Sequence, residues 1–318
     1  MEAAISEILD QVLQVGFFAA VIRVATPLLL ATLGEMFTER GGVLNLGIEG
    51  IMLFGAMIGF TTAYFTGELW LGIAIAAVAG VGFGLLMGLL TVSLGLSQHV
   101  SGLGVTMLCT GLSFYLYRLI FGQPSQPPHV RPFATLALPG LADLPWLGPV
   151  LFNQFTLVYL AFLLVPLAAF VLYWTPWGLS LRTVGENPHA AVSAGVNVAW
   201  ARYQALMISG ALMGIAGAYL SLAQFNAFTF GVVSGRGWVC IALVVLGQWD
   251  PWRVAGAALL FGAIDALGLR LQSSGGIDLP YQVFLMLPFL ATIVAMAVLA
   301  RKARAPAALL TPFRREER

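Results

Sequence analysis

The chain has 318 residues, of which 59% are hydrophobic and 9% are charged, and its mean hydropathy is +0.91. Because soluble domains carry about 25% charged residues, this composition excludes an ordinary soluble protein and predicts an all-α, polytopic helical membrane protein. The 15 basic and 14 acidic residues nearly balance, so the bulk charge argues against a nucleic-acid partner.

The first residues predict an amphipathic segment rather than a membrane span. Within residues 1–15 an apolar face recurs at helical spacing and consists of Ile5, Ile8, Leu9, Val12 and Leu13. The beginning of the chain is acidic, and no small-residue cleavage site follows it. We therefore expect no cleavable signal peptide.

Nine apolar segments are candidates for membrane spans, each of which needs about 20 apolar residues, and eight or ten spans also fit the pattern. They comprise roughly residues 16–37, 47–65, 69–94, 100–121, 154–174, 203–223, 236–248, 253–271 and 281–300. Pro27 is expected to break the first segment, and the short segment 236–248 is expected to be a half-helix or a re-entrant piece. Without a soluble domain, residues 1–318 are expected to form one membrane domain with some discontinuous helices.

Arginine and lysine in short loops and tails predict the orientation of these spans. The tail at 301–318 carries Arg301, Lys302, Arg304, Arg314, Arg315 and Arg318, so we expect the C-terminus on the cytoplasmic side. Counting back through alternate faces places the loop 175–202 inside as well. The proline-rich loop 122–153 and the acidic N-terminus are then expected outside.

The first polar cluster spans residues 35–50, and it contains a glycine-rich stretch. Asn45 and Glu49 are spaced to lie on one face of a helix that begins near Leu44. A glycine-rich break before a polar helix start is typical of a discontinuous helix at a substrate path. The alternative is a cytoplasmic turn in which Glu49 pairs with an arginine.

Two further polar clusters border apolar segments. Gln98 lies at the start of the fourth span, where it either caps the helix or lines a path. Phe225 and Asn226 belong to the stretch 224–238. There, aromatic side chains beside amides suit a flat, hydrogen-bonding ligand, but they equally suit an aromatic belt at the membrane interface.

The remaining ionisable and small residues of the spans are expected to have structural roles. Arg118, Asp265 and Arg270 are expected to pair or to extend toward the interface rather than to bind substrate. Small residues at helical spacing predict close packing of helices in lipid, and they are Gly80, Gly84 and Gly88; Gly210, Gly214 and Ala218; and Gly55 and Gly59.

A polar island at residues 181–197 separates two long apolar runs. The pattern predicts a loop, then a helix start with Asn187 as N-cap and Pro188 at the first helical position. One or two helical turns follow, and Gly195 is expected to end them. A short helix across the membrane face is the shape by which a transport permease docks on its ATPase. The alternative is a plain interhelical loop.

The sequence lacks the motifs of nucleotide hydrolysis and of metal binding. It contains no G-x-x-x-x-G-K-[ST] motif, and its one lysine, Lys302, lies in the tail, so we expect no ATPase site in this chain. His99, His129 and His189 are far apart, and no metal site is expected. Both cysteines lie in apolar runs, as Cys109 and Cys240, and are expected to be small core residues.

These segments together resemble the permease subunits of bacterial ATP-binding cassette (ABC) importers of the ribose and branched-chain amino acid type. Among these, the chain is most similar to the permeases of nucleoside uptake systems. The segments that carry the resemblance are 39–53, 184–197, 209–220, 235–238, 247–251 and 279–282. The sequence departs from the family in two places. His189 replaces the glutamate of the docking loop, and the stretch 95–99 differs from the asparagine-rich version expected of nucleoside members.

The resemblance implies a permease subunit, not an enzyme, in the cytoplasmic (inner) membrane of a bacterium. Its implied partners are a second, homologous permease, a cytoplasmic ABC ATPase that uses ATP and magnesium, an extracytoplasmic substrate-binding protein and membrane lipid. No cofactor is expected in this chain itself. The expected ATPase-coupling residues are Gly185, Glu186, Asn187, Pro188, Ala191 and Gly195, and the expected path residues are Asn45, Glu49, Gln98, Phe225 and Asn226.

Other functions also fit the sequence. Within the importer class, the substrate is a nucleoside or, alternatively, a simple sugar or a branched-chain amino acid. In a different class, the chain is an ion-coupled secondary transporter, although its few intramembrane carboxylates argue against that reading. A membrane anchor for another complex is a third class.

Overall fold

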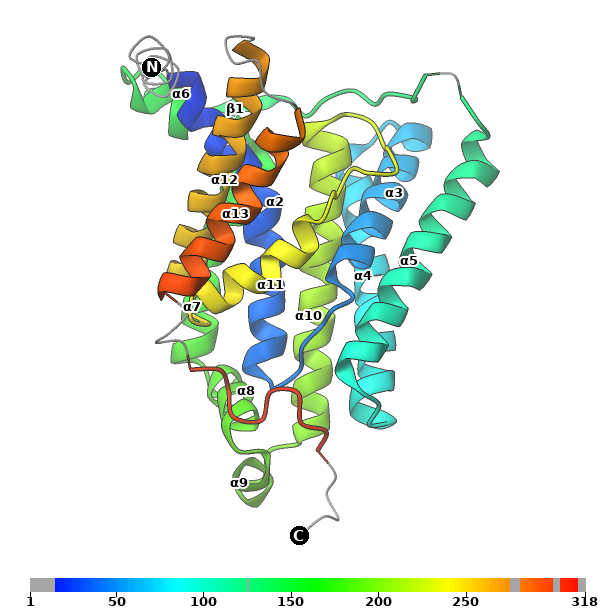
Figure 1. Cartoon of the computed structure of the whole chain (residues 1–318), viewed down its shortest axis with the longest axis vertical. Helices are drawn as coiled ribbons and strands as arrows, with labels where there is room; N and C mark the ends of the chain where they lie inside the picture. Colours follow the sequence, from blue (N-terminus) through cyan, green and yellow to red (C-terminus); the bar gives the residue numbers. More distant parts are fainter. Residues whose placement is uncertain (1–14, 125, 275–280, 300–303, 314–318) are drawn as a thin grey trace.

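Long apolar helices that run along one axis dominate the computed structural model, which describes residues 15–124, 126–274, 281–299 and 304–313 (Figure 1). Seven helical stretches of this described part are long and apolar enough to cross a membrane. They are Val15–Arg40, Ile48–Thr66, Leu69–Ser93, Gln98–Phe121, Thr156–Trp174, Val198–Gln224 and Pro251–Gln272. The other two predicted spans, 236–248 and 281–300, fall on the shorter apolar stretches Arg236–Leu246 and Met286–Ala297.

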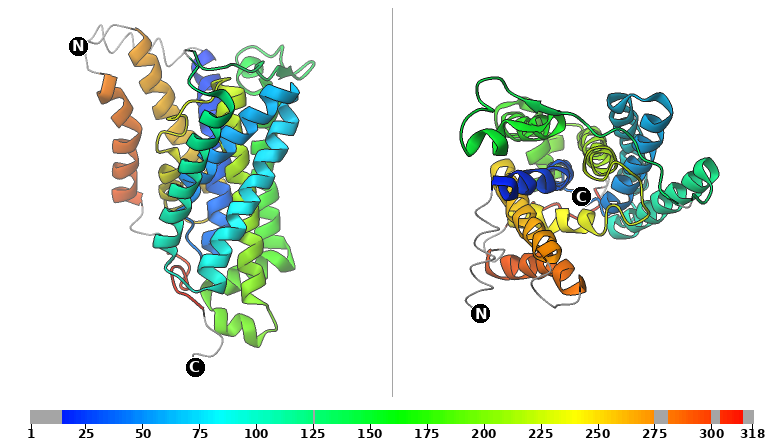
Figure 2. Two further views of the ribbon diagram at one scale, coloured as in Figure 1. Left: turned by 90° about the vertical axis from the view of Figure 1, so that its right-hand side faces the viewer. Right: turned by 90° about the horizontal axis from the view of Figure 1, so that it is seen from above.

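The helices of the bundle follow one another up and down its length (Figures 1 and 2). They are α2 (Val15–Arg40), α3 (Ile48–Thr66), α4 (Leu69–Gly88), α5 (Gln98–Phe121), α7 (Thr156–Trp174), α10 (Val198–Tyr219), α11 (Arg236–Leu246), α12 (Pro251–Ser274) and α13 (Tyr281–Leu299). Two π-helical turns, η1 (Leu89–Ser93) and η2 (Leu220–Gln224), extend α4 and α10. The predicted amphipathic segment 1–15 lies outside the described residues, apart from Val15.

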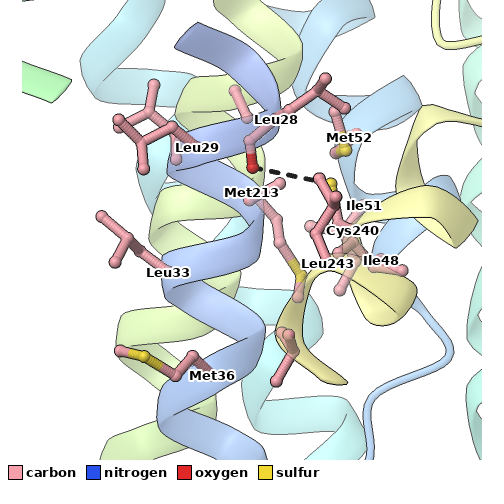
Figure 3. Packing of buried hydrophobic residues seen from close by; sticks show 14 of the residues in the cluster. Leu28, Leu29, Leu33, Met36, Ile48, Ile51, Met52, Met213, Cys240 and Leu243 are labelled. Atoms are coloured by element: carbon pink, nitrogen blue, oxygen red, sulfur yellow. Dashed lines mark hydrogen bonds between the residues drawn. The ribbon is translucent and has the colours of Figure 1, made fainter. Parts of the chain in front are cut away.

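Helix α2 forms the centre of the core, because every residue from Val24 to Glu39 is buried. A helix that is buried on all sides needs apolar residues around its whole circumference, and α2 has them. Figure 3 shows Leu29 and Leu33 projecting from one side of α2 and Leu28 from the other. On the side of Leu28 lie Ile48, Ile51 and Met52 of α3, Met213 of α10, and Cys240 and Leu243 of α11. The structure therefore confirms Cys240 as a core residue.

Pro27 does not break the first span, contrary to the sequence-based expectation. It removes the N–H that would bond to the carbonyl of Arg23 one turn earlier. Tyr219 of α10 donates its hydroxyl to that carbonyl at 3.1 Å, and Thr26 donates to the carbonyl of Ile22 at 2.7 Å. A neighbouring helix thus supplies the missing donor, which is how proline is tolerated inside membrane helices.

Glycines allow α4 and α10 to cross at backbone contact, as the small-residue spacing predicts. A Cβ atom added to Gly80 would overlap the carbonyl of Gly210, and one added to Gly210 would overlap the carbonyl of Gly80. On the opposite side of α10, a Cβ on Gly55 of α3 would lie 2.5 Å from the carbonyl oxygen of Gly214. In lipid, where apolar surface alone does not drive association, such close approach provides the packing energy.

The loop 122–153 contains more regular structure than an all-α fold predicts. Strand β1 (Thr135–Ala137) pairs antiparallel with β2 (Asn153–Phe155), with Leu136 opposite Gln154, and α6 (Leu147–Leu151) lies between them in the chain. Arg23 of α2 donates to the side chain of Gln154 at 2.8 Å and so fixes this hairpin to the bundle. These two three-residue strands add to a structure that is otherwise helical, as the sequence predicts.

The opposite end of the bundle carries α8 (Pro176–Glu186), α9 (Pro188–Ser193) and residues 304–313 (Figure 1). These elements lie away from the hairpin and from the beginning of α2, as a second view also shows (Figure 2). The predicted loops 122–153 and 175–202 therefore occupy opposite ends of the molecule. This arrangement agrees with the alternation of faces expected from the sequence.

Candidate functional site

Two short helices form the end of the bundle at residues 175–202. Thr175 caps α8 by accepting the N–H of Gly178 at 3.1 Å, and Pro176 occupies the first helical position. Residues 181–186 are therefore the end of an eleven-residue helix and not the loop expected from the sequence. The cap at Thr175 lies directly after the preceding apolar run, so the helix starts earlier than the polar island itself indicates.

Helix α9 has the local structure that the sequence predicts. The side chain of Asn187 accepts the N–H of Ala190 at 3.0 Å, and Pro188 follows at the first helical position. Ala191 is buried beneath the helix, and Gly195 ends it with a φ of +84°, in the left-handed region that favours glycine. Glu186 and Asn187 are exposed and form part of the surface that a docking partner would meet.

Helix α8 contacts the end of α2 through a glycine. A Cβ atom on Gly185 would overlap the carbonyl of Arg40, the last residue of α2, so this crossing requires glycine. Arg40 in turn donates from Nε to the carbonyl of Trp249 at 3.0 Å. Trp249 donates from its indole nitrogen to Glu39 at 2.6 Å. The turn between α11 and α12 is thereby fixed to the end of α2.

The chain between α2 and α3 is buried but not helical, and we call residues 41–47 the break. The N–H groups of Gly41, Gly42 and Val43 donate to backbone carbonyls of the last turns of α2, whereas those of Leu44, Asn45 and Gly47 donate to side chains. Leu44 donates to Gln98 Oε1 at 2.8 Å, Asn45 donates to Glu35 Oε1 at 2.8 Å, and Gly47 donates to Asn45 Oδ1 at 3.0 Å.

Helix α3 therefore begins at Ile48 rather than near Leu44. The reason is that Asn45 bonds to the backbone two residues ahead, which is a turn that competes with helix formation. Asn45 thus lies before the helix and Glu49 lies in its first turn, so the two do not share a helical face.

The carbonyl groups of the break also have side-chain partners. Arg202 of α10 donates from Nε to Gly41 at 3.1 Å, Gln98 donates from Nε2 to Gly42 at 3.3 Å, and Thr106 of α5 donates to Leu46 at 2.8 Å. Sequence reasoning did not select Arg202 or Thr106. Arg202, as a charged residue at the start of an apolar run, carried a signal that could have selected it.

Glu49 joins the break to α11. Its two carboxylate oxygens accept the N–H groups of Gly235 and Gly237 at 2.8 and 2.7 Å, at the N-terminus of α11. A negative charge is favoured there because the first N–H groups of a helix lack partners and carry partial positive charge. A Cβ on Gly237 would lie 2.6 Å from the Cα of Glu49, so glycine is required for this approach.

The structure brings three of the five predicted path residues together. Asn45, Glu49 and Gln98 surround the break, and each is bonded to backbone groups. Phe225 and Asn226 follow η2 at the end of the bundle with the 122–153 loop, where the backbone carbonyl of Asn226 accepts the N–H of Val130 at 3.0 Å. The assignment of all five to a substrate path remains a prediction.

Two of the three ionisable residues expected to have structural roles, Asp265 and Arg270, contact a partner side chain. Asp265 of α12 forms a salt bridge with Arg236 at 3.4 Å, which fixes the first residue of α11. Arg236 therefore pairs with Asp265, while Glu49, which the alternative interpretation paired with an arginine, accepts the backbone N–H groups of Gly235 and Gly237. The guanidinium of Arg270 lies over the ring of Phe17 at 5.7 Å. In the described part of the chain, no group of three or more His, Cys, Asp or Glu residues is arranged to hold a metal ion.

Two features stand out in this arrangement. One is the break between α2 and α3, beside which Glu49 of α3 accepts the N–H groups at the start of α11. The other is the short helix α9 at one end of the bundle, preceded by α8, which contacts the end of α2 at Gly185.

Comparison with known proteins gives a consistent assignment. The family described as "Branched-chain amino acid transport system / permease component" matches residues 17–301. A putative glucose ABC transporter permease protein of Haloferax volcanii, TsgC13, is 42% identical over 262 residues, which cover 81% of this chain and 78% of that protein. No solved structure matches the chain.

Two bacterial relatives cover more of the chain. The guanosine ABC transporter permease protein NupQ of Bacillus subtilis is 35% identical over 303 residues, which cover 91% of this chain and 93% of that protein. The nucleoside ABC transporter permease protein NupC of Lactococcus lactis subsp. cremoris is 34% identical over 292 residues, with 89% of this chain and 92% of that protein covered.

Proposed function

The chain belongs to the branched-chain amino acid transport system permease family, and on that premise we propose that it is the permease subunit of an ABC importer for nucleosides. The observation that carries the nucleoside assignment is the match to the guanosine and nucleoside permeases along almost their entire length.

Glucose is the second candidate substrate. The putative glucose permease has the higher identity, 42%, but the match covers 81% of this chain, compared with 91% for the guanosine permease. Simple sugars and nucleosides both present hydroxyl groups to a transporter, so the scaffold alone does not separate them. Branched-chain amino acids are the third substrate class within the family.

In the proposed mechanism, α9 is the helix that docks on a cytoplasmic ABC ATPase, which supplies the ATP and magnesium chemistry. Closure of the ATPase moves α9. Helix α8 moves with it because only one residue, Asn187, connects the two helices. At Gly185, α8 contacts the carbonyl of Arg40, so the displacement reaches the end of α2. The break follows Arg40 directly and is the part of the membrane domain that moves next.

Roles for the individual coupling residues follow from their positions. Glu186 is exposed for contact with the ATPase, while Gly185 permits the contact with α2. Asn187 and Pro188 define the start of α9, and Ala191 seats it on the bundle. Gly195 allows the chain to turn toward α10.

The path residues are proposed to act at two depths. Phe225 and Asn226 are placed to meet a nucleoside arriving from an extracytoplasmic binding protein at the end with the 122–153 loop. Asn45, Glu49 and Gln98 act deeper, by holding the break in the conformation that keeps the path closed. When the break moves, their hydrogen bonds to the backbone exchange.

The proposed topology has nine crossings, with α11 as a half-helix and with the break and α3 together forming one crossing. The end with α8, α9 and the basic tail is cytoplasmic in this proposal, and the 122–153 loop faces outward. Apolar side chains on α5, such as Val100, Met107 and Leu119, are exposed in the single chain. They are available to contact lipid or the second permease.

Reconstitution of the complete transporter tests the proposal. The chain, its second permease, the ATPase and the binding protein are placed in proteoliposomes with ATP inside, and uptake of radiolabelled guanosine is measured. Excess unlabelled nucleosides should compete, whereas glucose and leucine should not. A variant ATPase with its P-loop lysine replaced by alanine is the matched control and should abolish uptake.

The alternatives give different results in the same assay. Competition by glucose without competition by nucleosides would assign the chain to sugar uptake. Uptake by the chain alone, driven by an ion gradient and independent of the ATPase, would show a secondary transporter and contradict the importer assignment.

A further inference from the structure

We propose that residues 304–313, which we call the C-terminal strap, couple α9 to the break, with Phe313 as the residue that positions α9. This inference rests on the proposed function, since coupling has meaning only if α9 docks on an ATPase. It adds a structural element that the sequence does not predict, because the sequence indicates only that the tail is basic.

The strap contacts α8 at Gly185, in the last turn of that helix. Ala308 donates its N–H to the carbonyl of Gly185 at 2.8 Å, and the Ala308 side chain is buried. Gly185 is also the residue that contacts the end of α2. One hydrogen bond therefore fixes the strap at the point where α8 crosses the helix that leads into the break.

The strap also reaches the break itself. A Cβ atom on Gly42 would lie 3.0 Å from the guanidinium of Arg202 and 3.1 Å from the carbonyl oxygen of Ala308. Gly42 has a φ of +81°, so the chain turns here into the break. The carbonyl of Ala308 and the buried Arg202 thus close over the residue at which the break begins.

At its other end the strap holds α9. The ring of Phe313 lies 5.1 Å from the ring of His189, in the first turn of α9. Phe313 also packs against a buried apolar cluster that joins α8, α9 and α10, formed by Val184, Ala191, Val198 and Ala201. Helix α9 has only six residues, and such a short helix depends on tertiary contacts for its position.

Phe313 lines two surface hollows. One, of about 260 Å³, is lined by residues 186–189 and by Ala307, Ala308, Thr311, Pro312 and Phe313 of the strap. The other, of about 430 Å³, is lined by Val192, by residues 195–199 and by Phe313. Because both hollows border α9, removal of the Phe313 ring would take away a contact that holds α9 in place.

Local contacts restrict the conformation of the strap. Pro306 and Pro312 restrict the backbone, and local hydrogen bonds run from Leu309 N–H to the carbonyl of Pro306 at 3.0 Å and from Thr311 Oγ1 to the carbonyl of Ala308 at 2.7 Å. These restrictions limit how far Phe313 can move relative to Ala308. A movement of α9 reaches Gly42 through the strap as well as through α8.

The test compares Phe313→Ala with Phe313→Tyr and with Leu310→Ala in the reconstituted transporter. Leu310 is an exposed apolar residue of the same strap and serves as the matched control. The measured quantities are the maximal rate of guanosine uptake, its half-saturation concentration, and the guanosine transported per ATP hydrolysed. Recovery of the ATPase with the purified permease is measured for each variant.

We expect Phe313→Ala to lower the guanosine transported per ATP by roughly two- to thirtyfold, the usual range for residues that couple two sites. The half-saturation concentration and the recovery of the ATPase should stay unchanged, and Phe313→Tyr and Leu310→Ala should behave as the wild type. Ala308→Leu, which displaces the strap from Gly42, should show the same loss and keeps the test valid if Phe313→Ala folds poorly.

Two results would overturn the strap assignment. One is an unchanged ratio of transport to hydrolysis in both Phe313→Ala and Ala308→Leu. The other is a loss of transport that only parallels a loss of bound ATPase, which would make the strap a structural support. Absence of ATP-dependent guanosine uptake by the wild type would instead contradict the proposed function.

Discussion

The break and the docking helices α8 and α9 both connect long helices of the bundle. The hydrogen-bond partners of their backbone groups come from different parts of the chain. In the break, local carbonyls of α2 accept the first N–H groups, but several other backbone groups bond to side chains of helices farther along the chain, namely Gln98, Thr106 and Arg202. In the docking helices, Thr175 caps α8 and Asn187 caps α9, each from the position directly before the helix.

The difference follows from the surroundings. Inside a bilayer an unbonded N–H or carbonyl group costs several kcal/mol, so the break must recruit side chains from other helices. At the membrane surface water completes what the caps leave open. We therefore expect substitutions in the break to destabilise the fold, and substitutions in the docking helices to affect coupling with little loss of stability.

The largest effect is expected for Glu49→Ala. The change leaves the N–H groups of Gly235 and Gly237 without acceptors in the interior, at about 1–3 kcal/mol each. Thermal unfolding of the purified transporter, followed by retention in size-exclusion chromatography after heating, should show a large drop in melting temperature. Glu49→Gln keeps one acceptor oxygen, so its melting temperature should lie between those of the wild type and Glu49→Ala. Equal melting temperatures for Ala and wild type would contradict the capping role.

A smaller loss is expected for Gln98→Leu. Leucine has a volume similar to that of glutamine, but it cannot accept the N–H of Leu44 or donate to the carbonyl of Gly42. The free energy of unfolding should therefore fall by about 1–3 kcal/mol. His99→Leu, at the neighbouring exposed position, is the matched control and should melt like the wild type. If Gln98→Leu kept full stability and full transport, its place in both the break and the path would be excluded.

The contrast between the two regions also explains which features the sequence predicts. The caps at Asn187 and Pro188 and the helix end at Gly195 are local patterns, and the structure confirms each of them. The small residues Gly80 and Gly210 were likewise recognised, because close packing depends on a short repeat.

The features that the sequence did not predict depend on distant contacts. The start of α3 was placed near Leu44 because nothing nearby indicates that Gln98 and Glu35 hold residues 44 and 45 out of a helix. Pro27 is expected to break the first span because the local sequence does not show its compensating contact. The hydroxyl of Tyr219, which is 196 residues from Arg23 in the chain, donates to the Arg23 carbonyl. The strap was missed for the same reason.

On the docking face, Gly195→Trp should separate coupling from stability. A side chain in the left-handed region costs about 1–2 kcal/mol, but there is open space beside Gly195 within 4 Å, so the fold should persist. The indole would project at the end of α9 and obstruct the ATPase. The Trp variant should lose both guanosine uptake and the stimulation of ATP hydrolysis by substrate. Gly195→Asn should retain both activities, because asparagine tolerates the left-handed conformation. Intact uptake in the Trp variant would contradict docking at α9.

The smallest effect is expected for Asn187→Ala. Loss of the side chain that accepts the N–H of Ala190 should destabilise α9 by about 1 kcal/mol, the usual cost of removing an N-cap. Because α9 is one short helix at the surface, global melting should hardly change, and hydrogen exchange should rise only within residues 188–193. Asn187→Asp preserves the cap and should restore protection. A drop in global melting as large as that of Glu49→Ala would mean that the docking helices support the core, and the contrast between the two regions would then be wrong.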